Sequence, residues 1–329
     1  MEHPVTHTSS QTLVARIRRP TNVTGATVVS VATVVVGVVA SVAIENFPTA
    51  SNIRAMFLSV SLIGIIAVGL SLITIVGKVF TLSIPSLVAL STIMFASMLH
   101  LGPWIALLST VTASAAVGLV QGIVVGRVGT DPIITTIATA AIMLGIGQLW
   151  TSGRTIVGDG DPTFFNSNIF GLFPFQATVF VLFAFTLFWW QKYSTAGRKL
   201  MLVGLNERAA TIMGLRSWPL ITLAFVVSGA ATGLAGALLS AQSGQGNLLL
   251  GQSFGFDAIV AVVVGGVSIK GGAGTPLGAA IGALFVGLLS NVLALLSLTY
   301  ETQLVVKGLL VLAAVTATGI TARNERSGK

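Results

Sequence analysis

Long apolar segments separated by short polar stretches make up most of the chain. Most of them are long enough to cross about 30 Å of hydrocarbon as an α-helix. They predict ten spans, which are Val23–Ile44, Ala55–Val76, Leu82–Leu99, Gly102–Val125, Pro132–Trp150, Pro174–Trp190, Trp218–Leu239, Phe254–Ile269, Ala273–Leu296 and Leu304–Ile320. The pattern therefore predicts an all-α polytopic membrane protein with about ten transmembrane helices.

Two of these spans leave the count open. Phe254–Ile269 is short, and Leu82–Leu99 contains Pro85. Either is compatible with a half-helix, which is tolerated at membrane depth where protein buries the irregular backbone. Eight spans are the alternative. In both cases the chain divides into a tail (1–22), a transmembrane domain (23–320) with a polar loop at 192–217, and a second tail (321–329).

Composition and charge support this class and orient the chain. Hydrophobic residues make up 54% of the sequence and charged residues 8%, against roughly 25% charged in soluble domains. Lys and Arg in short loops stay on the cytoplasmic side. With ten alternating spans and the N-terminus inside, fourteen basic residues lie inside and two, Arg54 and Arg154, lie outside. Both termini are therefore expected to be cytoplasmic, and no cleavable signal peptide is evident.

The polar loop contains one short helix pattern, "GLNERAATIMGL" at 204–215. Asn206 suits an N-cap, Glu207 follows where the helix dipole favours an anion, and Gly214 suits the left-handed position that closes a helix. About seven residues give roughly 10 Å of helix, too short to span. The pattern predicts a capped interfacial helix.

Two functions suit this helix. Leu205, Ala209, Ile212 and Met213 share one face by their spacing. The helix could simply stabilise the loop, or it could dock a cytoplasmic protein. The small side chains of Ala209 and Ala210 favour docking, because they permit close approach.

The same stretch, "GRKLMLVGLNERAATIMGL", resembles the cytoplasmic coupling loop of binding-protein-dependent ABC importer permeases, in the branch for ribose, other monosaccharides and autoinducer-2. The pattern of that family is matched by Gly204, Asn206, Ala209, Ala210, Gly214 and Leu215. The blocks Phe256–Leu289 and Thr302–Val315 are similar to the family's last spans, including a lysine at Lys307. The stretch Val120–Thr139 is a weaker match.

The resemblance implies a permease subunit that does no chemistry itself. It implies cytoplasmic ABC ATPase subunits carrying ATP and Mg, a second permease subunit, an external solute-binding protein, and residence in the bacterial plasma membrane. The coupling residues it implies are Gly204, Asn206, Glu207, Ala209, Ala210, Met213 and Gly214.

One motif departs from the family. Before the third span the family carries an acidic residue and a glycine, where this chain has Thr81 and Pro85. This puts any role of that acid in doubt, and it weakly favours a heterodimer in which another permease chain supplies the acid.

Enzymatic chemistry is not expected. The chain has no cysteine, which excludes disulfides and thiolate metal sites. Its three histidines form no metal or acid–base constellation. It has no G-x-x-x-x-G-K-[ST] phosphate loop, so ATP hydrolysis requires a separate chain. We expect this chain to bind no cofactor and no nucleic acid. The alternative to an ATP-driven importer is a self-contained secondary transporter or channel. A secondary transporter would need more ionisable groups within its spans than this chain has.

Polar residues within the spans are candidates for a translocation path. They are Gln121, Gln148, Asp257 and Asn291. Neutral amides suit a hydroxyl-rich ligand, although interhelical hydrogen bonds explain them as well. For Asp257 a helix-start position explains the charge, and Lys307 is expected to snorkel toward the outer boundary.

Glycines at helical spacing predict close helix packing. They are Gly118, Gly122 and Gly126, then Gly229 and Gly233, and finally Gly274, Gly278 and Gly282. A backbone-lined substrate path is the alternative for these stripes.

Overall fold

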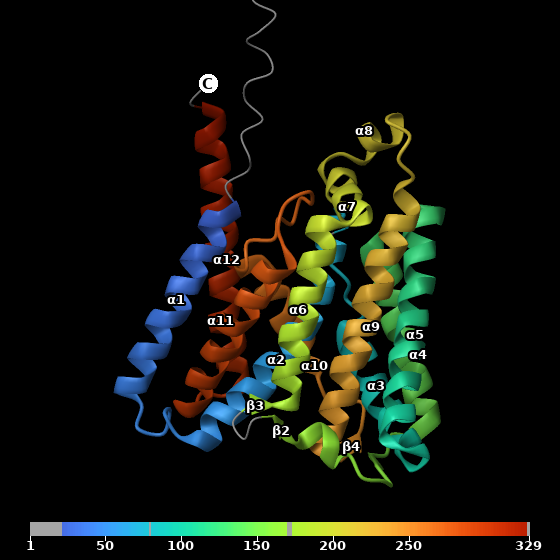
Figure 1. The fold of residues 1–329 in the computed structure, drawn as a ribbon, viewed down its shortest axis with the longest axis vertical. Helices are drawn as coiled ribbons and strands as arrows, with labels where there is room; N and C mark the ends of the chain where they lie inside the picture. Colours follow the sequence, from blue (N-terminus) through green and yellow to red (C-terminus); the bar gives the residue numbers. More distant parts are fainter. Residues whose placement is uncertain (1–21, 79, 170–172, 328–329) are drawn as a thin grey trace, which may run out of the picture.

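The computed structural model describes residues 22–78, 80–169 and 173–327, and the bundle is almost entirely helical (Figure 1). The helices are α1 Asn22–Ala43, α2 Ala50–Ile75, α3 Ile84–Met98, α4 Pro103–Ile123, α5 Pro132–Thr151, α6 Phe175–Tyr193, α7 Thr195–Leu205, α8 Glu207–Ile212, α9 Ser217–Ser243, α10 Gln252–Val264, α11 Pro276–Leu295 and α12 Tyr300–Ser327. Shorter helical turns are η1 Leu99–Leu101, η2 Val124–Val128 and η3 Thr163–Asn166. Nearly all of the expected N-terminal tail lies outside the described residues.

Four two-residue strands form two small antiparallel pairs. They are β1 Ile156–Val157, β2 Asn168–Ile169, β3 Phe173–Pro174 and β4 Gln245–Gly246. Strand β1 pairs with β4, and β2 pairs with β3. The β1–β4 pair joins the segment after α5 to the segment after α9, whereas the β2–β3 pair lies within the segment between α5 and α6.

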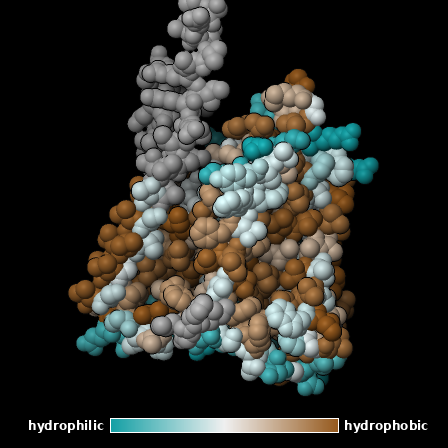
Figure 2. Space-filling view, in the orientation of Figure 1, coloured by the Kyte–Doolittle hydropathy of each residue, from teal (hydrophilic) through white to brown (hydrophobic). Residues whose placement is uncertain are grey.

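The all-helical membrane architecture is confirmed. Six stretches of the described chain are long and apolar enough to cross a membrane: Ala50–Ile75, Ile84–Leu101, Pro103–Val128, Pro132–Thr151, Ser217–Ser243 and Pro276–Leu295. Figure 2 shows a broad hydrophobic band between more hydrophilic ends. Each of the ten expected segments overlaps a helix, but the count of ten spans stays a prediction.

The two doubtful segments behave differently. Pro85 lies in the first turn of α3, where the missing N–H breaks no hydrogen bond, so this helix is uninterrupted. Helix α10 has 13 residues, about 20 Å at 1.5 Å each. It is therefore shorter than the roughly 30 Å of a hydrocarbon core.

Helix α2 is the centre of the bundle. Every residue from Val60 to Ile75 is buried, because α9, α11, α10 and α6 all pack on it. Helix α2 therefore has little surface left for lipid along that length.

Glycines bring α4 and α9 into close contact, as expected. A Cβ on Gly118 would overlap the carbonyl oxygen of Phe225, and one on Gly122 would lie 2.6 Å from the Cα of Thr222. From the opposite helix, Gly229 and Gly233 face Ser114 in the same way. Gly126 continues the contact against Trp218 and Ile221. The packing interpretation of these glycines is confirmed.

The third glycine stripe is only partly helical. Gly278 and Gly282 lie in α11 and contact the C-terminal part of α10, at Gly265 and Ala261. Gly274 precedes α11 and has a φ of +124°. The expectation that Gly274 belongs to a helical stripe is therefore wrong, because the helix begins only at Pro276.

The two expected loop regions lie at opposite ends of the bundle. Helices α7 and α8 are at the same end as the C-terminal end of α12, and β2, β3 and β4 are at the other end (Figure 1). This arrangement agrees with loops 151–173 and 192–217 facing opposite sides of a membrane. Which side is cytoplasmic stays a prediction.

Candidate functional site

Helix α8 has the caps that its sequence predicts. The side chain of Asn206 accepts a hydrogen bond from the backbone N–H of Ala209 at 3.0 Å. At the other end Gly214 has a φ of +81°. The N–H of Leu215 donates to Ala210 O at 3.0 Å, and that of Gly214 donates to Thr211 O at 2.9 Å. This pair of bonds is a Schellman motif, so the boundaries of α8 are confirmed.

The structure divides the residues of α8 between an exposed and a buried side. Leu205, Ile212 and Met213, which share one face by their spacing, are all exposed, Ile212 by 87% and Met213 by 66%. Ala209 on that face is half-buried. Ala210 is fully buried, because α8 packs on α7 and α9, so close approach of a partner to both alanines is not supported. Docking of a partner on α8 stays a prediction.

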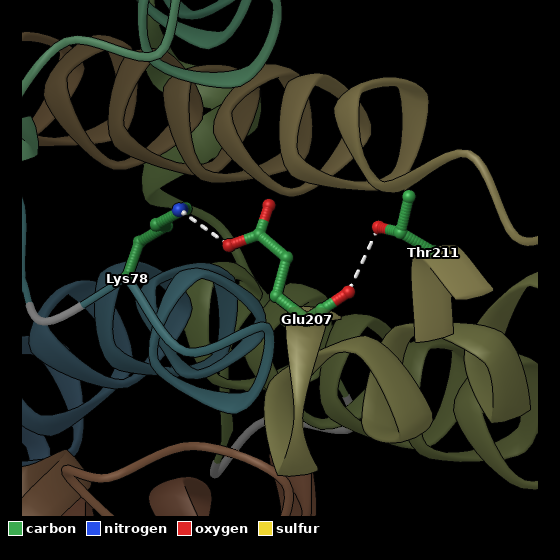
Figure 3. A network of polar contacts seen from close by, with 3 residues as sticks. All are labelled: Lys78, Glu207 and Thr211. Carbon is green, nitrogen blue, oxygen red and sulfur yellow. Dashed lines mark hydrogen bonds and ion pairs between the residues drawn. The ribbon is translucent and has the colours of Figure 1, made fainter. Parts of the chain in front are cut away.

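An ion pair connects α8 to the segment after α2. Lys78 Nζ lies 3.1 Å from Glu207 Oε2, and the two side chains are 19% and 45% exposed. The Thr211 hydroxyl donates to the Glu207 carbonyl oxygen at 2.8 Å, as Figure 3 shows. Glu207 therefore lies in the first turn of α8, as expected, and also contacts a second element.

Backbone contacts beneath this ion pair join three loops. The N–H of Gly272, between α10 and α11, donates to Ile75 O at 2.8 Å. A Cβ on Gly204 would overlap that same carbonyl oxygen and lie 2.6 Å from Gly272 N. Gly271 approaches Gly77 equally closely. We call this contact of Gly77, Gly204, Gly271 and Gly272 with Ile75 the glycine junction; it joins α7–α8 to the ends of α2 and α10.

A cavity of about 270 Å³ lies between α2, α10, α11 and α12; we call it the polar cavity after its ion pair, although more of its lining surface is apolar. Its lining residues are Ala55, Met56, Ser59, Ile63, Ser253, Phe254, Asp257, Gly287, Ser290, Asn291, Ala294, Tyr300, Gln303 and Lys307. Two of the four expected path residues, Asp257 and Asn291, thus come together in one cavity, although they lie in different helices.

The charged groups of this cavity form a buried ion pair. Lys307 Nζ donates to Asp257 Oδ1 at 2.7 Å, and the two side chains are 3% and 5% exposed. The expectation that Lys307 snorkels is wrong, because its ammonium group is held inside by a carboxylate. Asp257 is the sixth residue of α10, so a helix-start position does not explain its charge either.

Asn291 is fixed by a reciprocal amide pair. Its Nδ2 donates to Asn52 Oδ1 at 2.8 Å, and Asn52 Nδ2 donates to Asn291 Oδ1 at 3.1 Å. The pair joins α2 to α11 at the edge of the cavity. Interhelical hydrogen bonding is therefore present at Asn291, and a contact with solute stays a prediction.

The two glutamines lie elsewhere. Gln121 is buried and its Nε2 donates to Ser83 Oγ at 2.8 Å. Ser83 is also hydrogen-bonded to the buried Thr81 hydroxyl at 2.7 Å. The position where the family carries an acid is therefore part of a neutral network of hydroxyl and amide groups. Gln148 is exposed on α5. Neither glutamine lines the polar cavity.

Sequence reasoning missed Lys307 and the serines of the cavity as site residues. A signal for Lys307 was present, since an acid and a base in two apolar segments, Asp257 and Lys307, are expected to pair at membrane depth. Ser59, Ser253 and Ser290 gave no such signal, because single serines are common in membrane helices.

Comparison with known proteins agrees with this architecture. Residues 52–315 match the family model described as branched-chain amino acid transport system / permease component. The chain is 32% identical over 286 residues to the ribose import permease protein RbsC of Bacillus subtilis (strain 168), covering 84% of this chain and 88% of that protein.

Two further relatives are of similar length. The L-arabinose transport system permease protein AraH of Escherichia coli (strain K12) is 32% identical, with 83% of this chain and 84% of that protein covered. The D-allose transport system permease protein AlsC of the same strain is 30% identical, with 86% and 87% covered. No solved structure matches the chain significantly. The family match and these relatives together show that the chain belongs to the permease components of the branched-chain amino acid transport system family, in the branch that includes sugar permeases.

Proposed function

We propose that this chain is the membrane subunit of an ATP-driven importer and forms the translocation path for a monosaccharide or a related small polyhydroxylated solute. The observation that carries the proposal is the match over residues 52–315 to a permease family. Relatives named for ribose, L-arabinose and D-allose transport support a monosaccharide as the solute.

The structure supports a separate ATPase through the shape of α8. Ile212 and Met213 form an exposed apolar tip at an end of the bundle where hydrophilic residues also gather (Figure 2). Exposed apolar patches with a polar rim are typical of protein interaction sites. We infer that this tip docks in a cleft of a cytoplasmic ATPase subunit. Gly204 and Ala210 are buried and would position α8 from beneath rather than contact the partner.

An external solute-binding protein would deliver the solute at the opposite end. Binding of the ATPase would then change the populations of two conformations of the permease, which differ in how its helices pack. This requires that the ATPase binds the two conformations with different affinity. No chemistry on the solute is needed for this cycle.

The test is uptake of a solute panel by proteoliposomes that contain the chain. Radiolabelled ribose, L-arabinose and D-allose are offered with and without the ATPase subunit, ATP and the external binding protein. We expect ATP-dependent accumulation of at least one sugar. Accumulation that requires an ion gradient but no ATPase would instead indicate a secondary transporter, and equilibration of the sugar without the ATPase would indicate a channel.

A second permease chain is part of the proposal. Thr81 takes part in a neutral network with Ser83 and Gln121, where the family carries an acid. We propose a heterodimer in which the other permease chain supplies that acid. A transport-competent complex that contains only this permease would contradict the heterodimer.

A further inference from the structure

The polar cavity lies in the half of the bundle remote from α8. Helix α2 ends at Ile75, beside Gly204, whereas the cavity is lined by the beginning of the same helix, from Ala55 to Ile63. At 1.5 Å per residue, Ser59 and Ile75 lie about 24 Å apart along α2. The first turns of α10 and α12 and the last turns of α11 complete the wall. In the proposed orientation this half is the external one.

The charged groups of the cavity still have hydrogen-bonding capacity. An ammonium group has three donors and a carboxylate has two acceptor oxygens. The 2.7 Å bond between Lys307 and Asp257 uses one donor and one acceptor oxygen. The pair therefore offers further donors and a further acceptor at a position that lines the cavity, and it does so without net charge.

The remaining polar lining is neutral. It consists of the hydroxyl groups of Ser59, Ser253, Ser290 and Tyr300 and the amides of Asn291 and Gln303. Such groups both donate and accept, as sugar hydroxyls do. A solute with net charge would leave that charge without a partner beside an already neutral pair, and burying an unpaired charge is strongly unfavourable. The polar part of the lining therefore suits a neutral, hydroxyl-rich molecule, and apolar residues such as Met56, Ile63 and Phe254 complete the wall.

The size of the cavity limits this molecule to about one sugar ring. Ligand pockets commonly have volumes of roughly 300–1,000 Å³, and this cavity has about 270 Å³. We propose that it is a solute subsite in which Asp257 and Lys307 bond to adjacent hydroxyl groups of one neutral monosaccharide. The subsite rests on the importer function proposed above.

A purely structural role for the ion pair makes a different prediction. Among the described elements, α12 packs mainly on α10 and α11, and the pair joins α12 to α10. If this is its only role, an apolar pair of similar volume should replace it without loss of transport, since such replacements of buried ion pairs are often neutral for stability. The double variant Asp257→Leu/Lys307→Met therefore separates the two roles.

The experiment uses the complete transporter in proteoliposomes, with the sugar that the wild-type complex accumulates. We measure permease abundance, stimulation of ATP hydrolysis by the binding protein, and the uptake rate at saturating binding protein. The double variant is expected to keep abundance and ATP hydrolysis while uptake falls at least tenfold. Wild-type uptake by the double variant would overturn the subsite and leave the importer function intact, whereas no uptake by the wild-type complex would contradict the function itself.

A second variant keeps the test independent of the ion pair. Ser290→Leu fills part of the cavity without leaving a charge unpaired, and it should also reduce uptake at least tenfold. Leu284→Phe is the matched control, because Leu284 lies on the same helix with its side chain partly exposed and does not line the cavity. Equal sugar uptake by Ser290→Leu and Leu284→Phe would overturn the proposal. A double variant that takes up no sugar would also overturn it if Ser290→Leu takes up sugar at the wild-type rate.

Discussion

Lys78 and Glu207 are 129 positions apart in the sequence and form an ion pair with a distance of 3.1 Å. The pair joins the segment after α2 to the first turn of α8 (Figure 3). The glycine junction lies nearby, where Gly204 of α7 contacts the end of α2. Because the ion pair is more exposed than the glycine junction, we expect the two contacts to contribute differently to the stability of the protein.

The ion pair should contribute little to stability. The Glu207 side chain is 45% exposed, and exposed pairs are typically worth about 0–1 kcal/mol because water and salt screen them. We expect a double-mutant cycle of Lys78→Ala and Glu207→Ala, measured by thermal unfolding in detergent, to give a coupling energy within that range and to shrink at high salt. A coupling of several kcal/mol would show that the pair is more desolvated than in this structure.

The glycine junction should tolerate substitution far less well than the ion pair. A Cβ on Gly204 would overlap the carbonyl oxygen of Ile75, and overpacking of this kind typically costs about 1–3 kcal/mol. We expect Gly204→Ala to lower the unfolding temperature of the purified chain. Gly308→Ala is the control, since a Cβ there meets no atom within 4 Å. Equal unfolding temperatures for both variants would contradict the close contact.

Docking of the ATPase should depend on the tip of α8. Because Ile212 is 87% exposed, Ile212→Glu should change the free energy of unfolding by no more than about 0.5 kcal/mol. In the complex the new carboxylate would be buried without a partner. A loss of about 3 kcal/mol in binding free energy corresponds to roughly a hundredfold weaker docking. We expect normal abundance in the membrane with much less ATPase co-purified.

The conservative variant Ile212→Leu serves as the control for docking. It should retain the ATPase, because the apolar surface is preserved. If Ile212→Glu retains the ATPase and full uptake, α8 only stabilises its loop.

The orientation can be tested because the chain has no cysteine. Single cysteines at Arg154 and Arg208 should react with impermeant reagents from opposite sides, since their loops lie at opposite ends of the bundle. Position 154 is expected to label in intact cells and position 208 only after permeabilisation. Labelling of position 208 in intact cells would reverse the proposed topology.

Local signals predicted α8 well, whereas the burial of Ala210 is decided by non-local contacts. The caps at Asn206 and Gly214 depend on bonds within a few residues, so the sequence contains all the information needed for them. Whether Ala210 faces inward depends on α7 and α9, which the periodicity of six helical residues does not report.

The cavity was harder to predict for the same reason. Asp257 and Lys307 are 50 positions apart, and each had a sufficient local explanation in helix position or snorkelling. Their pairing depends on how α10 and α12 pack. Gly274 is the opposite case, since Pro276 two positions later is a local sign that the helix begins there, and that sign outweighs regular glycine spacing.

The enclosure of α2 has a consequence for how the protein is made. This helix is the most hydrophobic of the candidate spans and also the most buried, so its apolar character is not explained by contact with lipid in the finished protein. Its main neighbours α9 and α11 lie far downstream in the chain and are synthesised much later. We infer that α2 enters the bilayer before them and that its hydrophobicity keeps it in the bilayer until the helices that enclose it have been made.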